Sequence, residues 1–265
     1  MWRRILLTTY AMDGTQIRAL VLDVRKKFPK ALWTDVPEWI DRDVLHVQLM
    51  YVPNGRLIDL GGGYSPISAV LARLGMDVTV VDTFASTKFY EHFSAHELCD
   101  TLQSFGAKLA KADLREYDPT TVFDPASVDA VDCFGTIYFF NPRALLERCM
   151  RVLKPGGTLV VECNNAASLL RRLRLLVGRN NTDTFQEYFL DNVHKRFWVK
   201  SDVEALAGYL KLSDYHLLGR NWSLYLSRKG LPKAALTVAD NALRPVPSLC
   251  NDIYLVGRKD DNSAT

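Results

Sequence analysis

The chain has 265 residues, a formal net charge of +3 and a hydrophobic content of 48%. This composition is that of a globular protein, and the length fits one α/β domain with insertions. Such a small net charge does not indicate a nucleic-acid binder, which usually carries a clustered basic face and a higher pI. The five cysteines are scattered and form no CxxC pair, so we expect reduced thiols rather than a disulfide framework or a zinc site.

The N-terminus begins like a signal peptide, but its apolar run ends at Thr8 and is too short for the apolar core of one. No stretch of the sequence approaches the length of a transmembrane helix. We therefore expect a soluble, cytoplasmic protein.

The first part of the chain is predicted to be helical. Apolar residues at helical spacing predict a helix over residues 14–29, which Pro29 ends, and residues 33–39 are expected to form a loop or short helix. Both segments precede the first clear strand, so residues 1–53 are predicted to form an N-terminal helical extension.

From residue 56 the pattern alternates between strands and helices. Strands are expected at 56–60, 78–82, 108–112, 128–134 and 158–163, and helices at 67–74, 87–105 and 143–153. A turn over residues 154–157 precedes the fifth strand. Strands separated by helices imply βαβ units and a parallel sheet. The predicted fold is α/β, with a doubly wound, mostly parallel, seven-stranded Rossmann-like sheet.

After residue 164 the alternation breaks down. We expect a helix at 201–210 with Ser201 as N-cap and Glu204 in the capping box, and strands at 212–218 and 252–256. The main domain is then 54–259, with irregular insertions after strands 5 and 6 on the acceptor side, at 165–200 and 220–249. The polar tail at 260–265 is expected to be disordered.

The residues that carry chemistry follow the strands. In an open α/β sheet, ligands bind at the carboxyl ends of the strands. Gly61–Gly63 follow the first strand, where glycines allow positive φ and close approach of a ligand to the backbone. Asp82 ends the second strand, where a carboxylate accepts ribose hydroxyls, and Asp113 follows the third, where it can accept an adenine amino group. Cys133 and Phe134 end the fourth strand, beside the expected place of a methyl donor.

A glycine loop alone is shared with nicotinamide-dependent enzymes, but here that interpretation fits poorly. Pro66 occupies the position of the third glycine of the dinucleotide fingerprint. Asp59 adds a carboxylate at the end of the first strand, which would repel a pyrophosphate but suits the cationic amino acid part of S-adenosylmethionine (SAM).

The segment Asp59-Leu60-Gly61-Gly62-Gly63 resembles the first motif of class I SAM-dependent methyltransferases. Asp82, Ala112-Asp113-Leu114, Ser127–Val131 and Arg151–Gly157 are similar to the later motifs, in order and at the usual spacing. The resemblance covers residues 54–164 well, and 200–220 and 250–259 more loosely. Ser65 departs from the pattern, because many members have a further glycine there.

This resemblance implies roles for the matching residues. Asp59 and Gly61–Gly63 would contact the methionine part of SAM, and Asp82 with its neighbour Thr83 would hold the ribose. Asp113 and Leu114 would frame the adenine. The expected cofactor is SAM, which leaves as S-adenosylhomocysteine (SAH).

The acceptor is expected to be a hydroxyl oxygen, whose attack benefits from a general base. His194 is the candidate, because related small-molecule methyltransferases often have a His-x-Arg segment there, although a surface or capping histidine would look the same. Tyr138 and Asn164 follow the fourth and fifth strands and can face the acceptor, although Asn164 can equally shape a loop. Residues 247–259 are similar to the ends of methyltransferases of glycan or natural-product assembly, which favours a saccharide, glycolipid or polyketide-like hydroxyl.

Two further features leave alternatives open. His92 and His96 share one face of a predicted helix, but no third ligand can be named, so no metal is expected. The Leu/Arg-rich run at 169–179 can be a lid whose arginines reach an anionic group, a helix lying on a membrane surface, or a helix with buried leucines and solvated arginines.

A methyltransferase acting on a small molecule or glycan is thus the leading interpretation. The alternatives are an NAD(P)-dependent oxidoreductase and a non-catalytic SAM-fold subunit. No nucleic-acid partner is expected, and the oligomeric state is left open, with a homodimer compatible with the sequence.

Overall fold

The computed structural model describes residues 13–28, 37–84, 94–137, 140–178, 198–221 and 233–260. Its seven strands form one sheet in the order β3-β2-β1-β4-β5-β7-β6. The strands are β1 (Arg56–Leu60), β2 (Asp77–Asp82), β3 (Lys108–Lys111), β4 (Val128–Phe134), β5 (Leu153–Asn164), β6 (Leu212–Arg220) and β7 (Asp252–Lys259). β1 pairs in parallel with β2 and β4, and β2 pairs in parallel with β3. β7 is antiparallel to both β5 and β6, so the predicted mostly parallel seven-stranded sheet is confirmed.

The described residues pack into two compact units. The N-terminal unit comprises residues within 1–113 together with 128–132, and the C-terminal unit comprises 114–127 and residues from 133 onward. The N-terminal unit contains α2 (Gly14–Arg25), α3 (Pro37–Met50), α4 (Pro66–Arg73) and α5 (Ala95–Ser104). The C-terminal unit contains α6 (Pro142–Val152), α7 (Leu169–Leu176), α9 (Lys200–Tyr209), α10 (Lys233–Leu243) and the 3-10 turns η2 (Pro119–Thr121) and η4 (Pro247–Leu249).

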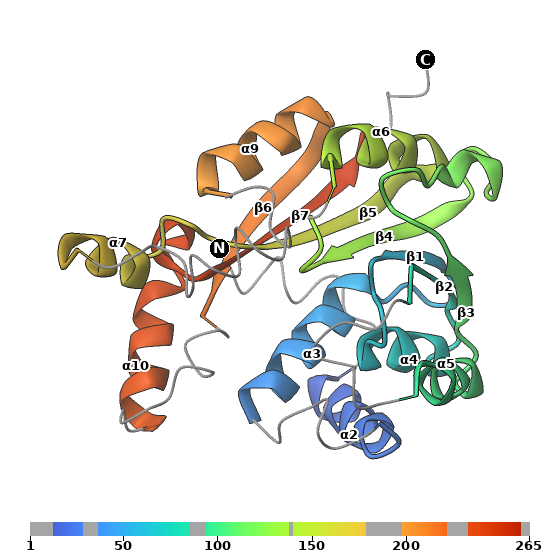
Figure 1. Ribbon diagram of the computed structural model, residues 1–265, viewed down its shortest axis with the longest axis horizontal. Coiled ribbons are helices and arrows are strands. Elements are labelled where there is room, and N and C mark those ends of the chain that lie inside the picture. Colours follow the sequence, from blue (N-terminus) through green and yellow to red (C-terminus); the bar gives the residue numbers. More distant parts are fainter. Residues whose placement is uncertain are drawn as a thin grey trace. The chain divides into compact units, whose positions relative to one another are not determined.

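In the N-terminal unit, α2, α3 and α4 pack against one another (Figure 1). Ile17, Val21 and Val24 of α2 are buried, which agrees with the helical spacing seen in the sequence, although the helix ends at Arg25. The helix α3 is longer than the loop or short helix expected there. Most of its length lies beyond residue 39. The buried residues there, Asp43, His46, Val47 and Met50, have helical spacing, but two of them are polar, so apolar periodicity did not mark the helix.

Helix α4, which follows β1, explains why Ser65 and Pro66 occupy positions where the glycine-rich fingerprint has glycines. Ser65 is the N-cap of α4, and its hydroxyl accepts a hydrogen bond from the N–H of Ile67 at 3.2 Å. Pro66 is the first residue of the helix, a position where the missing N–H costs nothing. Both residues are therefore helix-start residues that replace the glycines of other loops.

The C-terminal unit differs from expectation in three places. Residues 154–157, expected as a turn, belong to β5, although pairing with β7 starts at Thr158. α9 begins at Lys200, and the N–H of Val199 donates a hydrogen bond to the Asp202 carboxylate at 3.2 Å. The prediction of Ser201 as N-cap and Glu204 in the capping box is therefore wrong. The segment 220–249, expected to be irregular, contains the helix α10. The expected tail lies almost entirely outside the described residues.

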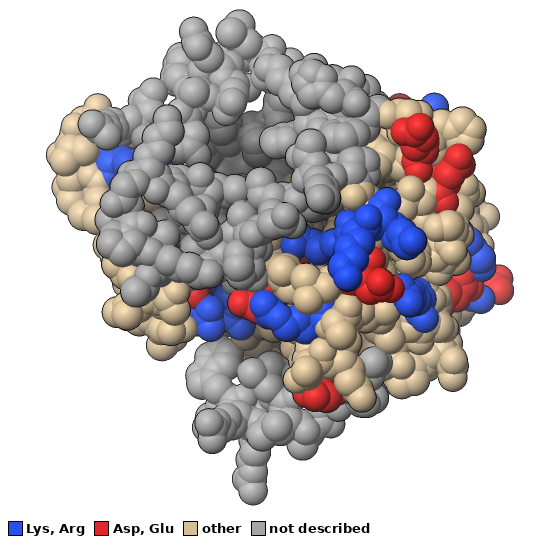
Figure 2. All heavy atoms as spheres, turned by 90° about the horizontal axis from the view of Figure 1, so that it is seen from below, with Lys and Arg blue, Asp and Glu red and all other residues tan. Residues whose placement is uncertain are grey.

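No helix in the described part of the chain is both long and apolar enough to cross a membrane. Figure 2 shows that basic and acidic side chains lie next to each other on the described surface visible in that view. Ion pairs in the N-terminal unit include Arg73 with Asp23 at 2.5 Å and Lys108 with Asp77 at 2.6 Å. Their charges offset one another locally.

Candidate functional site

The glycine loop lies between the end of β1 and the start of α4. Gly61 and Gly63 have φ values of 72° and 52°, a region that favours a residue without a Cβ. Gly62 is needed for a different reason, because a Cβ at this position would overlap the carboxylate of Asp59. The N–H of Gly61 donates to the carbonyl of Val81 on β2 at 2.7 Å, which ties the loop to the neighbouring strand.

Asp59 is a buried carboxylate directly beneath this loop, with an exposed fraction of 2%. The hydroxyl of Ser68 donates to Oδ2, whereas Oδ1 is buried and has no hydrogen-bond partner among the described residues. Burial raises the pKa of Asp59 well above its usual value, the nearby Asp132 raises it further, and the Ser68 hydrogen bond partly opposes them. A buried carboxylate oxygen without a donor, next to an open glycine backbone, fits the ammonium group at the methionine end of SAM.

Asp82 is the last residue of β2, and its side chain shapes the turn that follows. Its Oδ1 accepts hydrogen bonds from the N–H of Phe84 at 2.8 Å and from the Thr83 hydroxyl at 3.4 Å. Asp82 does not cap the next helix, since α5 begins at Ala95 and is capped by Ser94. Its other oxygen, Oδ2, has no hydrogen bond within the described chain and can accept one from a ribose hydroxyl.

The structure adds Tyr64 and Phe84 to this region, which the sequence did not single out. Tyr64 is buried in the glycine loop, and its hydroxyl donates to the carbonyl of Phe84 at 3.1 Å. The two rings lie 5.8 Å apart, and Phe84 has a φ of 49°. These contacts connect the glycine loop to the turn after Asp82, so the two predicted cofactor segments support each other.

The end of β3 lies beside the end of β2. Asp82 and Lys111 are register partners, and the N–H of Ala112 donates to the Asp82 carbonyl at 2.9 Å. Asp113 follows directly and is half-buried. Within the N-terminal unit, Asp113 therefore follows a strand end adjacent to Asp82, in the order expected for adenine and ribose contacts.

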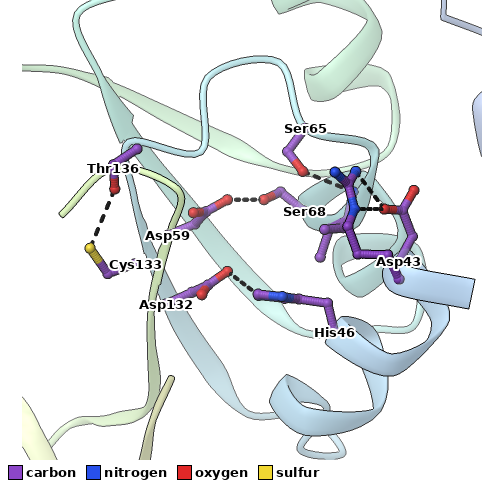
Figure 3. Close-up of polar contacts among 10 residues, drawn as sticks. Asp43, His46, Asp59, Ser65, Ser68, Asp132, Cys133 and Thr136 are labelled. Atoms are coloured by element: carbon purple, nitrogen blue, oxygen red, sulfur yellow. Dashed lines mark hydrogen bonds and ion pairs between the residues drawn. The ribbon is translucent and has the colours of Figure 1, made fainter. Parts of the chain in front are cut away.

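A second buried carboxylate, on β4, was not predicted from the sequence. Asp132 is the register partner of Asp59 and is 2% exposed. Its Oδ2 lies 2.7 Å from Nε2 of His46, a fully buried histidine on α3 (Figure 3). The sequence signal for this pair is an aspartate in the buried middle part of β4, next to apolar residues.

In the C-terminal unit, the expected residues lie at the ends of β4 and β5. The thiol of Cys133 is buried and lies 3.3 Å from the Thr136 hydroxyl. The ring of Phe134 lies 6.3 Å from that of Tyr254. Leu114, beyond β3, is half-buried. None of these contacts tests a role in cofactor binding, so those roles stay predictions.

Asn164 ends β5 and is half-buried. It is the register partner of Asp252 on β7, which is also the partner of Arg220 at the end of β6. The three residues therefore form a row across one edge of the C-terminal unit, and the sequence had pointed only to Asn164. Tyr138 and His194 lie outside the described residues.

The two features left open by the sequence are partly resolved. His96 is exposed and pairs with Asp100 at 3.0 Å, and His92 lies outside the described residues. The described part of the chain contains no cluster of three or more His, Cys, Asp or Glu suited to a metal. In α7, Leu173, Leu175 and Leu176 are 50%, 54% and 81% exposed, so the alternative of a helix with buried leucines is wrong.

Comparison with known proteins gives one family match. Residues 58–161 match the family model described as a methyltransferase domain. A ubiquinone biosynthesis O-methyltransferase of Xanthomonas campestris pv. campestris is 29% identical over 115 residues, which cover 43% of this chain and 45% of that protein. The mitochondrial ubiquinone biosynthesis O-methyltransferase of Schizosaccharomyces pombe is 24% identical over 182 residues, covering 64% and 61%. The chain thus spans less than two thirds of the length of these curated relatives.

Solved structures show the same fold. A SAM-dependent methyltransferase from Archaeoglobus fulgidus aligns with a TM-score of 0.55 and 14% identity, covering 87% of this chain and 97% of that chain. The phosphoethanolamine N-methyltransferase 2 of Haemonchus contortus, in complex with SAM, aligns with a TM-score of 0.56 and 17% identity, covering 83% and 52%. Residues 58–161 thus match a methyltransferase domain, and the sheet has the fold of solved SAM-dependent methyltransferases.

Proposed function

We propose that the protein transfers a methyl group from SAM to a hydroxyl oxygen of a small molecule. The observation that carries the proposal is the glycine loop closed over a buried carboxylate oxygen for which the described residues supply no hydrogen-bond donor. A cationic group would satisfy such an oxygen and balance its charge at the same time. A nicotinamide dinucleotide would bring a pyrophosphate to the same loop, which makes the oxidoreductase alternative unfavourable.

In this proposal, different residues of the chain contact different parts of SAM. Asp59 Oδ1 accepts from the ammonium group, and the loop backbone of Gly61–Gly63 lies against the methionine part. Asp82 accepts from the ribose through Oδ2, and Asp113 with Leu114 frames the adenine. When bound, SAM would supply a methyl group on a sulfonium, whose carbon the acceptor oxygen would attack in line while SAH departs with the C–S electron pair. The protein contributes mainly by aligning the acceptor, which is worth several kcal/mol, roughly 7–11 at the limit.

Oxygen is favoured as the acceptor atom because the curated relatives are named O-methyltransferases. Their name also favours a phenolic hydroxyl of a quinone precursor over the saccharide, glycolipid or polyketide-like hydroxyl expected from the sequence. The fold itself does not distinguish an oxygen acceptor from a nitrogen acceptor, since the structural neighbours include an N-methyltransferase. In this proposal His194 is the general base and Tyr138 and Asn164 orient the acceptor.

Contact with a membrane surface is part of the same proposal. The helix α7 carries exposed leucines beside Arg171, Arg172 and Arg174, a pattern suited to the headgroup region of an anionic bilayer. A quinone precursor with a long apolar tail would be presented there.

A methyl-transfer assay tests the proposal. The protein is incubated with SAM and, separately, a catechol, a quinone-precursor phenol, a sugar and a primary amine, and SAH and the methylated product are measured by mass spectrometry. We expect SAH to form with a phenolic acceptor, and His194→Ala to lower turnover while SAH affinity stays within roughly threefold. Methylation of the amine alone would contradict an oxygen acceptor.

Binding measurements separate the remaining alternatives. Calorimetry should show binding of SAM and SAH but not of NAD. Asp82→Ala should weaken SAH binding by roughly 10- to 150-fold, since hydrogen bonds to charged groups are worth about 1.5–3 kcal/mol. Tight binding of SAH without turnover on any acceptor would favour a non-catalytic subunit.

A further inference from the structure

Two buried carboxylates lie next to each other in the N-terminal unit. Asp59 on β1 and Asp132 on β4 are register partners in a parallel pair, and each is 2% exposed. Side chains in such register extend to the same face of the sheet. Figure 3 shows both carboxylates extending toward the side where Ser68 of α4 and His46 of α3 lie. Two buried negative charges at this spacing repel each other, so the arrangement is costly unless other groups offset it.

His46 forms a hydrogen bond with the carboxylate of Asp132. Its Nε2 lies 2.7 Å from Asp132 Oδ2, a distance at which the ring N–H donates a hydrogen bond to the carboxylate. The imidazole is fully buried, so no water competes for the contact. The other oxygen, Asp132 Oδ1, has no hydrogen-bond partner among the described residues. The hydrogen bond from His46 is therefore the main stabilisation of this carboxylate.

The other buried charge described on α3, that of Asp43, is already paired. Asp43 lies one turn before His46 and is 1% exposed. It forms ion pairs with Arg42 at 2.9 Å and with Arg25 of α2 at 3.2 Å. Two arginines thus offset one aspartate, and His46 remains the side chain of this helix that acts on the strand carboxylates.

The other groups that act on Asp59 are weaker or uncharged. Asp82 of β2 raises the pKa of Asp59 less than Asp132 does. Ser68 of α4 lowers it through its hydrogen bond. Within the described residues, the charge of Asp132 is therefore the largest electrostatic influence on Asp59 after burial itself.

We propose that His46 is a positioning residue of the cofactor site: by donating to Asp132, it offsets that negative charge and keeps Asp59 available as a carboxylate for the ammonium group of SAM. The helical extension before the sheet is then an electrostatic part of the SAM site. This inference rests on the proposed contact between Asp59 and the ammonium group.

Binding of SAH, measured by calorimetry from mildly acidic to mildly basic pH, tests the proposal. His46→Leu removes the donor that offsets the negative charge of Asp132, so this charge disfavours the carboxylate form of Asp59 more strongly. We expect SAH affinity at neutral pH to fall roughly 10-fold, within the range of coupling between neighbouring sites, and the acidic limb of the binding profile to move to higher pH. His46→Gln keeps an N–H donor and should retain most of the affinity.

A double-mutant cycle distinguishes charge balance from packing. Asp132→Asn removes the charge that His46 offsets, so His46→Leu/Asp132→Asn should bind SAH within roughly threefold of the wild-type protein. A packing defect at His46 would persist in the double variant. If folded His46→Leu binds SAH with the wild-type pH profile, or if Asp132→Asn fails to restore binding, the proposal is wrong.

Two controls keep the outcome clear. If His46→Leu does not fold, the single variant Asp132→Asn tests the proposal. The acidic limb of its SAH-binding profile should lie at lower pH than in the wild-type protein, and an unmoved limb overturns the proposal. Asp59→Asn tests the contact on which the inference rests. Normal SAH affinity in that variant would defeat the role of Asp59 itself, whereas weak binding in Asp59→Asn with normal binding in His46→Leu would defeat only the role of His46.

Discussion

Asp59 in the N-terminal unit and Asp240 in the C-terminal unit are both buried carboxylates, yet their surroundings differ. Asp240 is 1% exposed, and its oxygens accept from Asn221 Nδ2 at 2.9 Å and from Arg244 Nε at 2.8 Å. Among the described residues, Asp59 has one hydroxyl donor, one oxygen without a donor, and a second carboxylate as its neighbour.

The difference separates a structural role from a functional one. The contacts of Asp240 hold α10 to the end of β6 and balance its charge, so the fold itself accounts for them. The fold does not account for Asp59, because an unsatisfied buried charge lowers stability. Buried charges left unsatisfied by the protein concentrate where a ligand completes them. The comparison supports the proposed binding role of Asp59, and the following substitutions test it.

The largest effect is expected for Gly62→Ala. The new Cβ would overlap the Asp59 carboxylate, so the loop or the carboxylate must move. A displacement of about 1 Å can cost roughly 100-fold, and we expect at least this loss of SAH affinity by calorimetry. Gly208→Ala in α9 is the matched control, because its Cβ meets no atom within 4 Å and should leave SAH binding unchanged. Equal losses in both variants would refute the role of the loop.

Asp240→Ala should mainly reduce stability. The substitution removes the oxygen acceptor of the buried Asn221 Nδ2, which among the described residues keeps only its longer contact with the Cys250 sulfur, and removes the partner of Arg244. We expect the free energy of unfolding, from urea titration, to fall by about 2–3 kcal/mol. SAH affinity should stay within roughly threefold, since the residue is structural. A large loss of SAH binding in folded protein would erase the contrast between the two aspartates.

Asp59→Asn should separate stability from function. The amide keeps the bond to Ser68 but carries no charge, so SAH binding should weaken roughly 10- to 100-fold. At neutral pH the variant should be more stable than the wild type by about 1 kcal/mol, since a buried charge is removed.

The pH dependence of that difference has a definite sign. Because the pKa of Asp59 is raised in the folded protein, wild-type stability increases as pH falls through this pKa and is lost as pH rises through it. The stability advantage of Asp59→Asn should therefore shrink toward acidic pH in thermal melts. A difference that grows toward acidic pH would show that Asp59 is stabilised, not strained, by its surroundings.

The smallest effect on stability is expected at α7. Leu176 is 81% exposed, so Leu176→Ser should change the free energy of unfolding by less than about 0.5 kcal/mol. Binding to vesicles of anionic lipid, measured by sedimentation, should decrease if this helix contacts a membrane. Val122→Ser, at a 61% exposed position away from the helix, is the control. Identical vesicle binding by both variants would remove α7 from any membrane contact.

The local parts of the fold could be predicted because local rules decide them. β1 and β4 have the predicted bounds, since short apolar runs that end at glycine or at polar residues leave little choice. The predicted start of α9 was one residue too late. Ser201 and Asp202 are both residue types that cap helices, and the hydrogen bond from the Val199 N–H to the Asp202 carboxylate decides between them. α10 was missed because its apolar residue Val238 is exposed while the polar Asp240 is buried, so apolar residues do not mark the inward face of this helix.

The sequence by itself determined the class of the protein and the cofactor loop. Those features depend on residues close together in the chain: glycines with positive φ, a carboxylate just before them, and strand ends that recur in order. Only the tertiary structure decided that Asp59 lies beside Asp132, and that His46 reaches Asp132 from the helical extension. These partners are far apart in the chain, so strand register and helix packing bring them together, and no local pattern records that contact.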